Sequence, residues 1–244
     1  MSRVILAGGR ELDATTPAGR ALARCGSVAV VTVAAAFRRP DALHSQIKAW
    51  AQNLSLEHAV SRERRSDSVA VDYSVVSAVR RSDALDPEVY GPIAECDGVL
   101  VLDGSPAHFV SAVMATPLLD AIVAARQRGA DVVWSGAAAA AVCASMVDDR
   151  GGALTVGLGL HDGIVVAAGW EGWPRDRRRR LWRMVPDRLL FMALESGAAV
   201  CSTAEPEVLA SSSSPDDWTV LGGAVEARRG GTAVTLEHWR RPTP

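Results

Sequence analysis

The stretch DVVWSGAAAAAVCASM, residues 131–146, has small residues at positions 135–137. They lie between an apolar run and an alanine run, where some enzymes carry a reactive side chain. The pattern predicts a buried strand, a tight turn and an alanine-rich helix. In a corner of this kind, the nucleophile elbow, a Ser or Cys is held on a strained turn with its side chain in a crevice. This corner offers only Ser135, Gly136 and Ala137.

Other loops that could contribute chemistry also follow apolar strands: Gly8-Gly9, residues 103–106 and residues 168–173. Strands that are apolar on both faces and alternate with helices are typical of a parallel sheet covered on each side. Ligands in such sheets bind at the carboxyl ends of the strands. We therefore expect an α/β fold, a three-layer sandwich with a mostly parallel central sheet, as a single domain over residues 1–244. Residues 103–106, 134–138 and 168–173 should surround one cleft.

Two helical segments have clear signals. Residues 116–129 predict a helix with Thr116 as N-cap, Pro117 at the first position and Gly129 at the end. The run RDRRRRLWRM, residues 175–184, predicts a solvated helix face, with a patch for phosphate or an acidic partner as the alternative.

The composition excludes several classes of function. A net charge of −2 provides no overall field that would attract nucleic acid or an anionic membrane. The four cysteines are far apart in the sequence and have no histidine at ligand spacing, so we expect no disulfide, no metal and no cofactor. The first apolar run has four residues, which is too short for a signal-peptide core, and no run approaches the roughly 20 residues of a membrane helix. We expect a cytoplasmic protein.

Several longer segments resemble the peptidase E and cyanophycinase family of serine peptidases, which have a class I glutamine-amidotransferase-like fold. They occur in the family's order and extend from about residue 3 to residue 210. The most specific is DDRGGALTVGLGL, directly after the elbow helix. The others are VVTVAAAFRRPD, SDALDPEV and CDGVLVLDGSPAHFVSAVMATPLLDAIVAA. The resemblance implies a serine peptidase or amidohydrolase.

The residues that carry the family's chemistry differ in this chain. The family's elbow reads Gly-x-Ser-Ala-Gly-Ala, and counting back from Met146 without gaps places Gly136 at the nucleophile position. Trp134 takes the place of the first glycine of that motif, which predicts an altered corner. The histidine that acts as general base in the family falls on Gly169. Both halves of the nucleophile–base pair are therefore degenerate.

A third change affects the loop that helps to bind the oxyanion. In the family this loop begins with Gly-Gly, whereas here Asp103 precedes Gly104. A carboxylate beside an oxyanion hole would repel the developing negative charge, and one donor of such a hole is typically worth about 2.7–4 kcal/mol. We therefore expect a catalytically degenerate relative that acts as a binding, scaffolding or partner subunit. Its partner would be an active paralogue or a second copy of the chain, and its ligand a small molecule or a peptide.

Two alternatives retain catalysis. In the first, the cleft is reused for other chemistry, with Asp103, Ser105, Ser135 and Glu171 facing one another and a buried carboxylate moving protons. In the second, the elbow register shifts by one residue, so that Ser135 is the nucleophile and His108 is the only candidate base.

The expected pocket is made from the elbow and the loops around it. Cys143 would lie nearly two turns into the elbow helix and is interpreted as a core residue. His161 precedes a strand and is expected at the opposite edge of the sheet. The predicted pocket residues are Gly104, Ser105, Trp134, Ala137 and Trp170.

Overall fold

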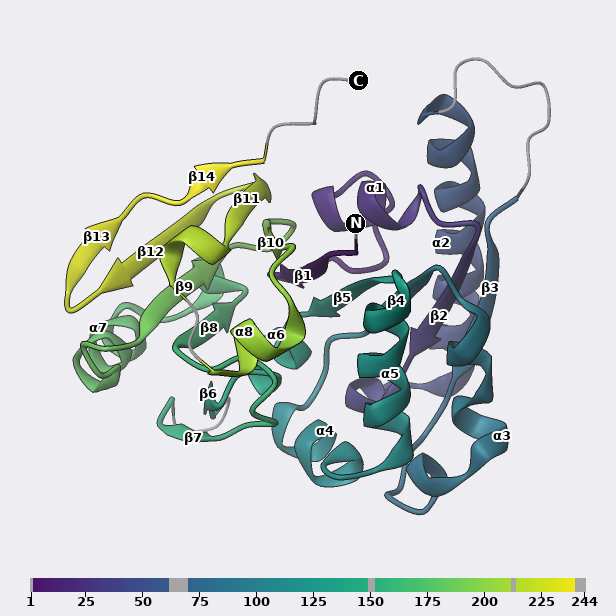
Figure 1. Cartoon of the computed structure of the whole chain (residues 1–244), viewed down its shortest axis with the longest axis horizontal. Helices are drawn as coiled ribbons and strands as arrows, with labels where there is room; N and C mark the ends of the chain where they lie inside the picture. The colour runs from purple at the N-terminus through teal and green to yellow at the C-terminus, as the bar shows by residue number, and fades with distance from the viewer. Residues whose placement is uncertain (1, 62–69, 149–151, 212–213, 240–244) are drawn as a thin grey trace.

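The computed structural model describes residues 2–61, 70–148, 152–211 and 214–239 (Figure 1). Its largest sheet has eight strands in the order β14-β11-β10-β1-β5-β4-β2-β3. The five strands β1, β5, β4, β2 and β3 are parallel, and β10 is antiparallel to both β1 and β11. The strands span β1 Val4–Ala7, β2 Ser27–Val31, β3 Asp72–Val76, β4 Gly98–Val101, β5 Asp131–Ser135, β10 Ala199–Ser202, β11 Thr219–Gly222 and β14 Glu237–His238.

Helices cover both faces of this sheet because the parallel strands are apolar on both faces. Ile5 and Val133 are buried in one cluster with side chains of α1 and α2. Leu6 and Trp134, one residue further along the same strands, are buried in a second cluster with side chains of α4 and α5. The predicted α/β class with a mostly parallel central sheet is confirmed. The helices span α1 Pro17–Leu22, α2 Pro40–Ser61, α3 Pro87–Tyr90, α4 Pro106–Val113, α5 Pro117–Arg128, α6 Ala137–Ala141, α7 Arg175–Met184 and α8 Pro206–Ser211.

A second sheet has four strands in the order β13-β12-β9-β8; one apolar face is covered by α7, and the other packs into the main core of the protein. The predicted strand that ends at Ala168 is β8, so it belongs to this sheet and not to the central one. The loop after β8 nevertheless contacts the central sheet, because the N–H of Gly169 donates to the carbonyl of Gly8 at 3.0 Å. The strands span β8 Ile164–Ala168, β9 Leu190–Leu194, β12 Val225–Arg229 and β13 Thr232–Val234. A separate antiparallel pair comprises β6 Ser145–Val147 and β7 Leu154–Val156.

The predicted bounds of α5 are confirmed. Thr116 is the N-cap residue, Pro117 is the first helical residue and Gly129 ends the helix with φ +115°. The hydroxyl of Thr116 does not cap the helix, however, since it donates to the carbonyl of Val113 at 2.7 Å.

The elbow helix α6 is shorter than expected and ends at Ala141. The chain after it pairs with a later segment: the N–H of Leu160 donates to the carbonyl of Val142, and the N–H of Ala144 donates to the carbonyl of His161. Cys143 therefore lies beyond the helix, in an isolated bridge with His161, and is fully buried. Its interpretation as a core residue agrees with this burial.

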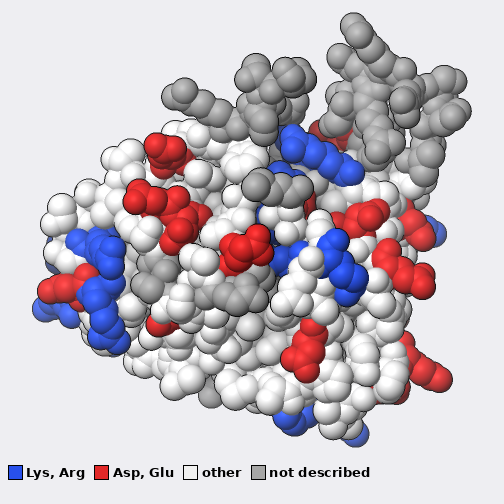
Figure 2. Space-filling model, viewed as in Figure 1, with Lys and Arg blue, Asp and Glu red and all other residues white. Residues whose placement is uncertain are grey.

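Charged side chains of both signs are mixed over the face seen in Figure 2. The basic group at its left edge lies over the arginine-rich helix α7. Half-buried arginines of this helix stack on indole rings: the guanidinium carbon of Arg177 lies 3.9 Å from the ring centre of Trp173, and that of Arg178 lies 5.0 Å from that of Trp170. The helix face is thus only partly solvated.

Among the residues that the structure describes, no single helix has the length and apolar composition needed to cross a membrane. Helices α4 and α5 meet that standard only when taken together, and they are bent by 94° at the break between them.

A buried ion pair joins the starts of β1 and β5. The side chains of Arg3 and Asp131 are 9% and 12% exposed. The Nε of Arg3 donates to both carboxylate oxygens of Asp131, at 3.2 and 3.1 Å, and its backbone N–H donates to Oδ1 at 2.9 Å. The pair therefore holds together two neighbouring strands of the central sheet.

We expect Asp131→Asn to lower the free energy of unfolding by about 3 kcal/mol, because it leaves a buried guanidinium without its counter-charge. Urea denaturation followed by circular dichroism measures the loss. The double variant Arg3→Met, Asp131→Leu is the control and should recover most of the stability, since apolar side chains can replace a buried pair. A loss below about 0.5 kcal/mol for Asp131→Asn would contradict the prediction.

Candidate functional site

The corner between β5 and α6 has the backbone conformation of a nucleophile elbow. Gly136 lies at φ +56° and ψ −121°, a region that residues with a Cβ rarely adopt. Its N–H donates to the carbonyl of Ala7 at 2.9 Å, which ties the corner to β1. The expected alteration by Trp134 is not found, because the ring of Trp134 is 2% exposed and packs 6.2 Å from Phe109 in the core below α4.

The carboxylate of Asp103 occupies the space in front of this corner. A Cβ built on Gly136 would overlap with the carboxylate carbon and both carboxylate oxygens of Asp103. The side chain of residue 103 thus lies where a side chain of residue 136 would begin. A serine at position 136 is incompatible with this placement of Asp103.

The same carboxylate also binds the backbone donors around the corner. Oδ1 of Asp103 accepts the N–H of Ala137 at 2.6 Å and the N–H of Gly104 at 2.7 Å. The N–H of the residue after the elbow is one of the two donors that form the oxyanion hole in elbow hydrolases, and a neighbouring loop supplies the other. Sequence reasoning expected Asp103 to repel an oxyanion. In the structure the carboxylate itself accepts the N–H groups of Ala137 and Gly104.

Burial raises the pKa of Asp103 above its ordinary value of 3.8. The N–H groups of Ala137 and Gly104 act in the opposite direction, and the nearby charges of Glu11 and Arg38 raise and lower the pKa, respectively. Glu11 and Arg38 form an ion pair of 3.0 Å. The carboxylate of Asp103 in the crevice is therefore easier to protonate than that of an exposed aspartate.

The crevice is a pocket of about 300 Å³ at the carboxyl ends of the strands. It brings together three predicted loops: Asp103 and Gly104 from one, Gly136 and Ala137 from the elbow, and Gly169 from the end of β8. Gly8 and Gly9 also line it. Gly104 is required for this arrangement, because a Cβ there would overlap with the carbonyl of Ala34.

Five predicted site residues do not line this pocket. Trp134 and Trp170 are both buried in apolar clusters. Ser105 caps α4, where its hydroxyl accepts the N–H of His108 at 3.4 Å. Glu171 is exposed and accepts the N–H of Ser196 at 3.0 Å. Ser135 is fully buried on β5.

The two predicted catalytic arrangements are not assembled. Ser135 Oγ is buried and has no hydrogen-bond partner among the described residues, so it bonds to no imidazole there. The ring of His108 packs edge-on against Phe37 at 4.8 Å. Partial burial favours a higher pKa for Glu171, but hydrogen bonding from Ser196 lowers it on balance, as in a loop carboxylate fixed to backbone.

Sequence reasoning missed three polar residues of the pocket wall: Arg10, Arg177 and Ser196. Arg10 follows the Gly8-Gly9 loop and forms an ion pair with Asp13. Arg177 lies in the run interpreted as a solvated helix face, and its Nη2 donates to the carbonyl of Asp148 at 3.1 Å. The sequence shows the positive charge of residues 175–184. It does not show that α7 packs against this crevice, because that packing depends on contacts between residues far apart in the sequence.

Two solved structures with a similar fold are described as peptidases. The chain superposes on a peptidase from an acI-B1 Actinobacterium with a TM-score of 0.70 and 16% sequence identity, covering 98% of this chain and 96% of that one. It superposes on a candidate peptidase E protein from Listeria monocytogenes EGD-e with a TM-score of 0.54 and 9% identity, covering 94% and 98%. No family model matches the chain, and no curated protein matches its sequence. The chain thus has a peptidase-E-like α/β fold.

The overlap between Asp103 and position 136 predicts a coupling energy. Gly136→Ala should lower the free energy of unfolding by about 3 kcal/mol, through strain at positive φ and collision with the carboxylate. In an Asp103→Ala background the loss should shrink by about 1 kcal/mol. Urea denaturation of the four proteins measures the cycle. Gly129→Ala, at positive φ but with open space around it, is the matched control and should be additive with Asp103→Ala. Additivity at Gly136 as well would contradict the overlap.

The raised pKa of Asp103 predicts a pH dependence. The folded protein binds this proton more tightly than the unfolded chain does, so the contribution to stability is present near pH 4 and is lost as pH rises through the folded pKa. Asp103→Asn removes that loss, and its stability relative to the parent should increase from pH 4 to pH 7. Unfolding at several pH values measures the difference, with the exposed Asp120→Asn as control. A constant difference between Asp103→Asn and the parent would contradict the assignment.

Proposed function

We propose that this protein is a catalytically degenerate relative of peptidase E and cyanophycinase that binds a small molecule or a peptide end in its crevice. One observation carries the proposal. The carboxylate of Asp103 takes both the space of an elbow side chain and the two N–H groups that would receive an oxyanion. A substrate carbonyl in the crevice would therefore find no nucleophile at the elbow and no free oxyanion hole.

The other positions of the mechanism support the same conclusion. Position 136 is glycine and cannot supply a hydroxyl, and Gly169 takes the position of the base. Ser135, the nearest hydroxyl in the chain, is fully buried. Serine-peptidase chemistry needs a nucleophile within hydrogen-bond reach of its base, and these residues do not provide that pair.

The crevice remains suited to a small ligand that carries both charges. Asp103 contributes a carboxylate, while Arg10 and Arg177 contribute guanidinium groups to the same pocket. The guanidinium of Arg177 is stacked on Trp173, which limits its motion. An amino group near Asp103 and a carboxylate near the arginines would match these charges, as in an amino acid or the end of a peptide.

A partner is part of the proposal. A fold kept without its chemistry is suited to regulate or support an active paralogue, or to pair with a second copy of itself. Native mass spectrometry of the purified chain, alone and mixed with an active relative from the same organism, tests for either complex.

We expect the purified protein to show no hydrolysis of aspartyl or β-aspartyl dipeptides and no labelling by a fluorophosphonate probe. Isothermal titration calorimetry with the same dipeptides should show binding that Arg177→Met weakens about tenfold, because a charged hydrogen bond is lost. The exposed Arg20→Met is the matched control and should leave binding unchanged.

The raised pKa of Asp103 favours one second candidate function, an enzyme that uses this acid for proton transfer. Turnover that disappears in Asp103→Ala would support that enzyme. Turnover or probe labelling that disappears in Ser135→Ala would instead support a serine hydrolase with a shifted nucleophile, and either result would overturn the non-catalytic proposal.

A further inference from the structure

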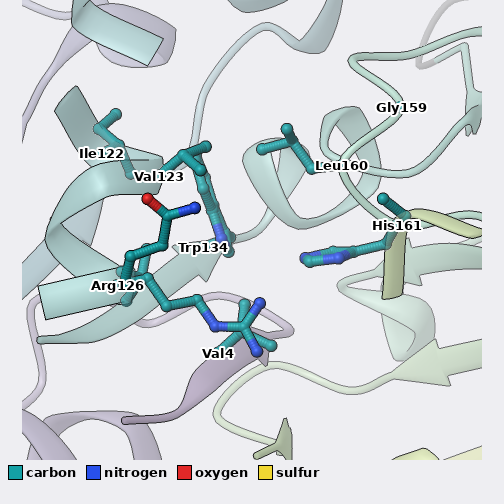
Figure 3. A pocket seen from close by; sticks show the side chains of 11 residues that line it. Val4, Ile122, Val123, Arg126, Trp134, Gly159, Leu160 and His161 are labelled. Atoms are coloured by element: carbon teal, nitrogen blue, oxygen red, sulfur yellow. The ribbon is translucent and has the colours of Figure 1, made fainter. Parts of the chain in front are cut away.

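A second pocket of about 230 Å³ lies away from the crevice, beside α5 and near the starts of β1 and β5 (Figure 3). Its wall is largely apolar and includes Val4, Ile122, Trp134 and Leu160. It shares no lining residue with the crevice. Trp134 of β5 lines this pocket, and Gly136, the residue directly after β5, lines the crevice.

His161 is the unusual residue of this pocket. It is 3% exposed, and neither ring nitrogen has a hydrogen-bond partner among the described residues. Its backbone is held on both sides, since its N–H donates to the carbonyl of Val142 at 3.2 Å and its carbonyl accepts the N–H of Ala144 at 2.8 Å. In Figure 3 the ring projects into the space between Leu160 and Arg126, towards Trp134.

The ring of His161 is uncharged at neutral pH. Burial, and secondarily the positive charge of Arg126, lower its pKa to about 3. A neutral imidazole offers one N–H donor and one nitrogen acceptor. Burying such groups without partners is unfavourable by about 1–3 kcal/mol, so a ligand that satisfies one of them gains that difference on binding.

The shape of the pocket limits the ligand. An apolar cavity of about 150 Å³ in another protein binds benzene, so this larger space can hold one ring or two fused rings. The indole of Trp134 provides a flat apolar wall. Nη2 of Arg126 donates to the carbonyl of Ala204, and Gln127, the other polar side chain of the wall, is exposed to solvent. The imidazole of His161 is therefore the buried polar group that can select a ligand.

We propose that this pocket binds an uncharged aromatic molecule of one or two fused rings with one hydroxyl group, and that the hydroxyl bonds to the ring of His161. A hydroxyl both donates and accepts, so it suits either tautomer of the imidazole. The rings pack against Trp134 and the apolar side chains of α5. This site is independent of the crevice and of the function proposed for it.

Three naphthalene probes that differ in one group, 2-naphthol, 2-methylnaphthalene and 2-naphthoate, test the assignment by isothermal titration calorimetry on the full chain. 2-Naphthol should bind saturably, and 2-methylnaphthalene, in which a methyl group replaces the hydroxyl, should bind about fivefold more weakly. His161→Phe should remove this difference between the two probes. The same substitution should raise the melting temperature of the free protein, because an apolar ring replaces an unsatisfied polar one.

Two further variants test whether the probes bind in this pocket, and they do so even if His161→Phe fails to fold. Val123 lines the pocket and is half-buried, so Val123→Trp should fill the space and abolish binding of both probes. Asp120→Trp, exposed on the same helix and outside the pocket, should leave binding unchanged.

Three results would overturn the proposal. The first is the absence of saturable 2-naphthol binding, and the second is binding that survives Val123→Trp. The third is tighter binding of 2-naphthoate than of 2-naphthol, which would assign the pocket to anions held by Arg126.

Discussion

One carboxylate organises the carboxyl-terminal edge of the central sheet. Asp103 follows β4, and its Oδ1 accepts N–H groups from its own loop and from the first residue of α6. The loop after β4 and the elbow after β5 are thereby joined by a single side chain. Because the acceptor is partly buried, these bonds are stronger than they would be in water. The same burial removes water from the carboxylate and so disfavours its charged form.

The close contacts around Asp103 depend on glycine. Gly104 lets its loop pack against the carbonyl of Ala34, and Gly8 lets β1 end against the backbone of Glu195. Gly136 supplies the positive φ and the absence of a Cβ that Asp103 needs. The corner thus adopts a strained conformation at a glycine, and the space beside that glycine is filled by Asp103 from a neighbouring loop.

Much of the fold could be predicted from local patterns. Apolar strands indicated the parallel sheet, and Thr116, Pro117 and Gly129 marked the bounds of α5. The three loops of the crevice were predictable as well, because parallel strands that alternate with helices end at one edge. The residues around position 136 also predicted an elbow with glycine at the nucleophile position.

Other features depend on contacts that a local pattern does not contain. The apolar run of β8 resembled a strand of the central sheet, but it pairs with β9 at the edge of the second sheet. Trp134 was assigned to the crevice because of its position next to the elbow, whereas side chains alternate along β5 and this one faces the opposite pocket. The direction of the Asp103 side chain is set by Ala137, which is 34 residues away in the sequence.

The indole stacking on α7 changes how the most basic stretch of the chain should be regarded. Arg177 and Arg178 lie over Trp173 and Trp170, and Arg228 from β12 lies over Trp182 at 4.5 Å. A polyanion arriving at this helix would meet guanidinium groups that the aromatic faces hold in place, and it would bind them through the N–H donors at their edges. Lysine could not replace these arginines without loss, because an ammonium group lacks the planar face that rests on the rings.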